Sequence, residues 1–75
     1  MSTDFSRLVG MIELAQEIDS LLSGFGVTFR SLDITRNADL IIENPHQYMP
    51  RTDHRVRRAV VELVREWKEL RYYEV

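Results

Sequence analysis

The most informative pattern in the sequence is an apolar seam near its C-terminal end. Apolar side chains there step by four, three, four and three residues, at Val56, Val60, Leu63, Trp67 and Leu70. This spacing predicts an amphipathic helix over residues 53–72, with arginines and glutamates on its other side. Thr52 or Asp53 can cap its first turn. Because Trp67 lies on the seam, we expect it in the core.

A second helical pattern covers residues 4–23. Its apolar stripe is wider than a coiled-coil seam, so the helix can bury against two surfaces at once, a sheet and a second copy of itself. Gly10 lies inside the pattern and can permit the close approach of another element. Gly24 is placed to end the helix in a left-handed conformation. The stripe consists of Phe5, Leu8, Met11, Ile12, Leu14, Ala15, Ile18, Leu21, Leu22 and Phe25.

The middle of the chain, residues 25–50, admits two interpretations. Residues 27–35 are rich in β-prone side chains, residues 36–39 resemble a turn, and residues 40–42 form a short apolar run before Asn44. These features predict a β-hairpin. Asn37 is the residue we expect to take a positive φ in the turn.

The rival interpretation of the middle segment is a helix over residues 31–43. It places Ile34, Ala38, Ile41 and Ile42 on one face. In either case, we expect residues 46–51 to form a loop bracketed by Pro45 and Pro50.

We therefore predict one small α+β domain spanning residues 1–75. Its helices, 4–23 and 53–72, pack on the hairpin in the order α-β-β-α. The alternative is an all-α three-helix bundle. A chain of 75 residues with no cysteine buries little surface and has no disulfide to stabilise it. We therefore expect a partner chain and predict a homodimer.

Composition excludes several classes of protein. Hydrophobic residues make up 44% of the chain, charged residues 29%, and the net charge is −2, as in an ordinary globular domain. The longest apolar run, Leu40-Ile41-Ile42, is too short to cross a membrane, and the N-terminus lacks a secretory pattern. The absence of cysteine removes thiolate chemistry and fits the cytoplasm, which is the location we predict.

A cluster of arginines at the start of the last predicted helix is the strongest candidate site. Arginine binds carboxylate and phosphate groups bidentately. The sequence pI of about 5.6 and the glutamates on the same helix favour a protein partner, with a small nucleic-acid-binding regulator as the alternative. Nearby, an aromatic residue and a methionine between two prolines resemble an interface hot spot. The predicted partner-binding residues are Arg51, Arg55, Arg57, Arg58, Tyr48 and Met49.

No pattern in the sequence points to catalysis. His46 and His54 are eight residues apart, which is not the spacing of a zinc site, and no nucleophile motif is present. A chain this short has little room for a substrate pocket. We expect no catalytic residues, no metal and no cofactor. The predicted function is a small non-enzymatic protein-interaction module, an adaptor, accessory subunit or inhibitor that regulates a partner protein by occupying its surface.

Overall fold

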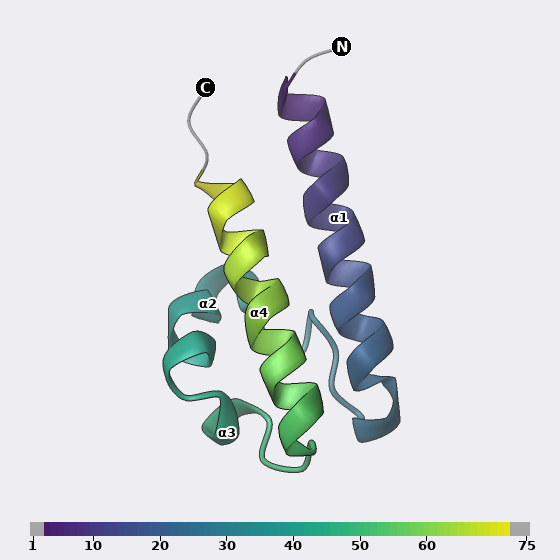
Figure 1. Ribbon diagram of the computed structural model, residues 1–75, viewed down its shortest axis with the longest axis vertical. Helices are drawn as coiled ribbons and strands as arrows, with labels where there is room; N and C mark the ends of the chain where they lie inside the picture. Colours follow the sequence, from purple (N-terminus) through teal and green to yellow (C-terminus); the bar gives the residue numbers. More distant parts are fainter. Residues whose placement is uncertain (1–2, 73–75) are drawn as a thin grey trace.

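The computed structural model describes residues 3–72, which form helices joined by short connections. Two long helices, α1 and α4, lie side by side and run in opposite directions (Figure 1). Helices α2 and α3 lie on the other side of α4, which contacts all three of the other helices. The helices are α1 (Thr3–Leu22), α2 (Ile34–Glu43), α3 (Pro45–Tyr48) and α4 (His54–Arg71), with a 3-10 turn η1 (Ser23–Phe25) after α1.

The predicted α-β-β-α fold is wrong, because no strand occurs between residues 3 and 72. The all-α alternative fits instead, with the short helix α3 added. The segment predicted as a hairpin contains α2, close to the rival helix over residues 31–43. Ile34, Ala38 and Ile41 are buried on one face of α2. A helix brings these side chains together against α4, and this packing outweighs the local β preference of their neighbours.

The backbone around α2 also differs from the predicted turn. Asn37 lies inside the helix, and its side-chain amide donates to the carbonyl of Leu32 at 3.1 Å. The positive φ falls instead on Asp33, at 51°, immediately before α2. The predicted loop over residues 46–51 is likewise partly helical, since α3 begins at Pro45, where proline's fixed φ suits a first helical turn.

The two long helices are confirmed close to their predicted bounds. Asp53 caps α4, because its Oδ1 accepts a hydrogen bond from the backbone N–H of Val56 at 2.9 Å. At the end of α1 the chain tightens into η1 before it turns. The left-handed residue there is Gly26, with φ of 71°, rather than the predicted Gly24.

The core lies between α4 and the other helices. Trp67 is only 5% exposed, which confirms its place on the buried seam. Its ring meets Phe29 edge-on, with ring centroids 5.6 Å apart, and the guanidinium of Arg71 covers it at 5.5 Å. The buried cluster consists of Ile18, Leu22, Leu32, Ile34, Ala38, Ile41, Met49, Val60, Val64 and Trp67.

Gly10 lies where α1 and α4 pack closely together. A Cβ placed on Gly10 would lie 3.1 Å from Cδ1 of Leu70, so the absence of a side chain lets the C-terminal part of α4 approach α1. This confirms the predicted close contact. The N-terminal turns of α1 continue past the end of α4 (Figure 1).

Candidate interaction surfaces

Three of the predicted arginines lie at the surface at one end of the molecule. Arg51 is exposed in the turn that precedes α4, and Arg55 and Arg58 are exposed on successive turns of α4. Residues three apart on a helix share a face, so Arg55 and Arg58 present their charges together. We call Arg51, Arg55 and Arg58 the arginine edge.

Arg57 has a different position from its neighbours. Its side chain is half-buried and its Nη1 donates to the backbone carbonyl of Met49 at 3.2 Å and also to that of Thr52. The buried hydroxyl of Thr52 donates to the same Met49 carbonyl at 2.7 Å. Arg57 therefore satisfies backbone acceptors in the turn between α3 and α4, which is a structural contact.

The aromatic and methionine candidates also contribute to packing. Met49 is completely buried in the core. Tyr48 is half-buried and packs against the same core cluster. The turn between the two prolines folds back onto the molecule, because Met49 supplies an apolar side chain that the core accommodates. Of the six predicted partner-binding residues, only the three of the arginine edge are fully at the surface.

The arginine edge differs in its pairing from four of the seven other cations of the chain. Arg7, Arg36, Arg65 and Lys68 each lie within 4.0 Å of a carboxylate of the chain itself. Glu62, which could reach Arg58, pairs instead with Arg65 at 3.8 Å. Within residues 3–72, no carboxylate pairs with any residue of the arginine edge.

A small hollow adjoins the arginine edge, between α3 and the start of α4. It has a volume of about 230 Å³ and is lined by both charged and apolar side chains. Val61 lies among charged residues of α4 and would be expected in solvent on that ground, but it is buried at this position. The lining residues are Pro45, His54, Arg57, Arg58, Val61 and Glu62.

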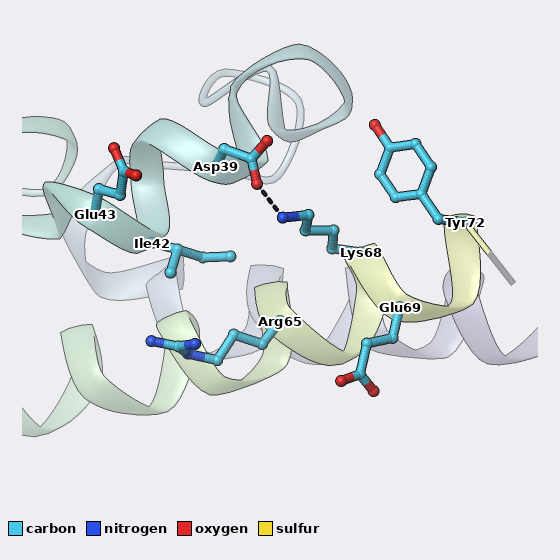
Figure 2. Close-up of a pocket in the computed structure, with 7 residues that line it drawn as sticks. All are labelled: Asp39, Ile42, Glu43, Arg65, Lys68, Glu69 and Tyr72. Atoms are coloured by element: carbon cyan, nitrogen blue, oxygen red, sulfur yellow. Dashed lines mark ion pairs between the residues drawn. The ribbon is translucent and has the colours of Figure 1, made fainter.

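A larger groove of about 430 Å³ lies between α2 and α4. Figure 2 shows the residues that line it, with Asp39 of α2 pointing toward Lys68 of α4. Lys68 of α4 forms an ion pair with Asp39 across it. The hydrogen bond to Asp39 raises the pKa of the Lys68 amine, with a smaller contribution from the charge of Glu43. The groove is therefore closed at its centre by a contact that holds α2 against α4.

The second candidate surface is apolar and lies on α1. We call Phe5, Leu8, Val9 and Ile12 the outer face of α1. Leu8 is 52% exposed, Ile12 is 56% exposed and Val9 is 37% exposed, and Phe5 is 56% exposed. The next residues on this side of the helix are Gln16 and Asp19, both polar and exposed, so the face is confined to the N-terminal half of α1. The unusual width of the apolar stripe was its signal in the sequence.

The histidines and acidic residues of the described chain do not form a metal site. His46 lies in α3, and His54 begins α4, both exposed. Across residues 3–72 no three His, Asp or Glu side chains gather where they could hold a metal ion. Nor is any helix in that range long and apolar enough to cross a membrane.

Comparison with known proteins finds no match to a family model, to a curated protein or to a solved structure.

Proposed function

We propose that this chain is a small non-enzymatic protein-interaction module that binds carboxylates on a partner protein through the arginine edge. The observation that carries the proposal is the exposure of Arg51, Arg55 and Arg58 without a carboxylate of the described chain beside them. Arginine forms strong bidentate contacts with carboxylates. A partner's aspartates or glutamates would supply the missing acceptors.

The position of the arginine edge supports the same function. Cations at the start of a helix oppose its dipole, so helix stability alone does not favour arginines there. The hollow beside Arg58 contains apolar surface from Pro45 and Val61, which suits a protein segment with an apolar side chain next to its acids. The proposed site omits Met49, Tyr48 and Arg57, because these side chains pack in or against the molecule.

A small nucleic-acid-binding regulator is the competing function, since the same arginines can bind phosphate. The net charge of −2 argues against it, because proteins that bind a phosphate backbone are usually basic. In the larger groove Lys68 pairs with Asp39, which raises the pKa of its amine, whereas a nucleophilic lysine needs its pKa lowered. The cytoplasmic location stays a prediction.

The test compares two triple variants in a quantitative capture experiment from lysate of the native cells. One carries Arg51→Gln, Arg55→Gln and Arg58→Gln. The matched control carries Arg30→Gln, Arg36→Gln and Arg65→Gln, which removes the same charge from exposed positions elsewhere. We expect wild type and control to capture the same proteins, and the edge variant to capture them at least about tenfold less, since each charge-assisted contact contributes about 1.5–3 kcal/mol.

Two results would contradict this function. Undiminished capture by a folded edge variant would show that the arginines do not bind the partner. Capture that disappears after nuclease treatment, and that weakens steeply with added salt, would favour the nucleic-acid alternative.

A further inference from the structure

The N-terminal half of α1 carries apolar side chains on opposite sides. Met11 and Leu14 on one side pack against the core cluster. On the other side, Leu8 and Ile12 are more than half exposed. A stripe this wide has more apolar surface than one neighbouring element covers. In the described chain, the side that carries Leu8 and Ile12 stays at the surface.

The size of the outer face matches what a small stable dimer needs. From the exposed fractions of its side chains, the face offers roughly 400 Å² of apolar surface, which is within the range of about 300–600 Å² that the largest, often functional, patch on a monomer covers. Interfaces between identical chains are about 65% apolar. At that fraction, a face of this size would form the apolar part of an interface of roughly 600 Å² per chain, or ~1,200 Å² in total, which is the lower limit for a specific complex.

The chemistry of the face favours a copy of itself over a charged partner. The four side chains of the face carry no charge, and the charged residues along its edges are Asp4, Arg7 and Glu13. Asp4 and Arg7 already pair with each other, so the face itself offers a charged partner no group to pair with. Because all four side chains are apolar, the face can pack against a copy of itself, which is the requirement of a two-fold interface.

We propose that a second copy of the chain covers the outer face, with the two α1 helices antiparallel across a two-fold axis. The centre of the face lies between Leu8 and Val9. A two-fold axis at that point sets Phe5 of each chain against Ile12 of the partner subunit. Antiparallel packing also brings opposite ends of the two helix dipoles together. The two α1–α4 pairs then form a four-helix arrangement with a second apolar core between the α1 helices.

This arrangement leaves the proposed arginine edges free. The start of α4 lies beside the end of α1, away from the N-terminal half that carries the outer face (Figure 1). In an antiparallel dimer the two edges therefore lie at opposite ends of the assembly. The dimer presents two equivalent edges, so a partner with two acidic segments would bind with avidity. The dimer proposal rests on other residues than the arginine edge, so either can fail alone.

The first experiment measures mass by analytical ultracentrifugation from about 1 to about 200 µM. We expect the wild-type chain to approach twice 8.9 kDa. The double variant Leu8→Gln/Ile12→Gln should be monomeric and helical, with its dissociation constant raised at least about a hundredfold. The control Leu40→Gln, at a 46% exposed leucine of α2, should dimerise as wild type does.

The second experiment tests the orientation and does not depend on the double variant folding. The chain has no cysteine, so Phe5→Cys and Ile12→Cys each introduce a single thiol. Mixed and treated with a short bismaleimide, the two proteins should form predominantly the mixed 5–12 cross-link. Predominant 5–5 and 12–12 products would show a parallel pair and overturn the proposed geometry.

Three further outcomes would overturn the dimer itself. One is a wild-type chain that remains at 8.9 kDa over the whole concentration range. Another is a dimer that the double variant leaves intact, since it would use a different surface. The third is a monomeric wild type whose Leu8→Gln/Ile12→Gln variant loses a partner protein in the capture experiment, because the face would then bind that protein.

Discussion

The two long helices of this chain bury their apolar residues in different ways. Helix α4 separates its sides, with Val60, Val64 and Trp67 buried and charged residues in solvent. Helix α1 buries Ile18 on one side and exposes Ile12 on another. Helix α4 is covered by α1 on one side and by α2 and α3 on the other (Figure 1), so its apolar residues are buried within the chain. The outer face of α1 stays exposed in the single chain, and we propose that a second copy covers it.

The largest expected effect comes from replacing Trp67, a buried residue of α4. Trp67→Ala removes the ring that Phe29 and Arg71 contact and leaves a cavity in the core. We expect the free energy of unfolding to fall by about 3–5 kcal/mol, enough to unfold much of a small domain. The measurement is urea denaturation followed by circular dichroism at a concentration where the chain is monomeric.

Ile12→Ala is the matched control for Trp67, at an exposed position of α1. Under the same monomeric conditions we expect it to change the free energy of unfolding by less than about 0.5 kcal/mol. An equal loss from both substitutions would mean that the outer face of α1 packs within the single chain, and the contrast between the helices would disappear.

An intermediate effect separates two adjacent arginines of α4. Arg57→Met keeps the aliphatic stem but removes the donor to the carbonyls of Met49 and Thr52. We expect a loss of about 1–3 kcal/mol of unfolding free energy, since the half-buried turn loses a charged donor. Arg58→Met should change it by less than about 0.5 kcal/mol, because Arg58 is exposed.

Equal stability of the Arg57 and Arg58 variants in thermal and urea unfolding would contradict this assignment. Arg57 would then belong with the partner-binding residues after all, and the charged side of α4 would be uniformly available to a partner.

The smallest effect concerns the ion pair between α2 and α4. Because Asp39 raises the pKa of Lys68 above 10.5, the pair stabilises the fold fully below that ordinary value. This contribution is lost as the pH rises through the higher pKa of the folded state. Asp39→Asn should lower the pKa of Lys68, as measured by NMR titration of its side chain. The variant should also lose less unfolding free energy than the wild type when the pH is raised. This effect on stability should be small, since both side chains contact solvent.

The exposed carboxylate of Glu66 provides the control for the Lys68 titration. Glu66→Gln removes one acid from α4 without touching the pair, so the pKa of Lys68 should stay where it is in the wild type. A similar shift in both variants would mean that the general charge of the protein, rather than Asp39, sets the pKa.

The candidate surfaces were only partly predictable from the sequence. The arginine cluster was visible as a run of charges, and the width of the α1 stripe indicated two covered sides. Arg57 and Arg58 could not be told apart, because their roles depend on where the turn before α4 places its carbonyls. Met49 lies between two prolines in the sequence, yet its burial depends on how that turn folds back onto the core.

By itself, the sequence determined the two long helices. Their apolar residues recur over many turns, so the helical periodicity fits them and the alternation of a strand does not. Asp53 marks the start of α4, because its side chain caps the first turn by a local hydrogen bond. Tertiary structure alone decided the middle of the chain. Residues 27–43 are too few for their pattern to exclude a strand, and the helix from Ile34 to Glu43 is favoured because α4 offers it an apolar surface. Secondary structure in so short a segment follows the partner it packs on, and that partner is distant in the sequence.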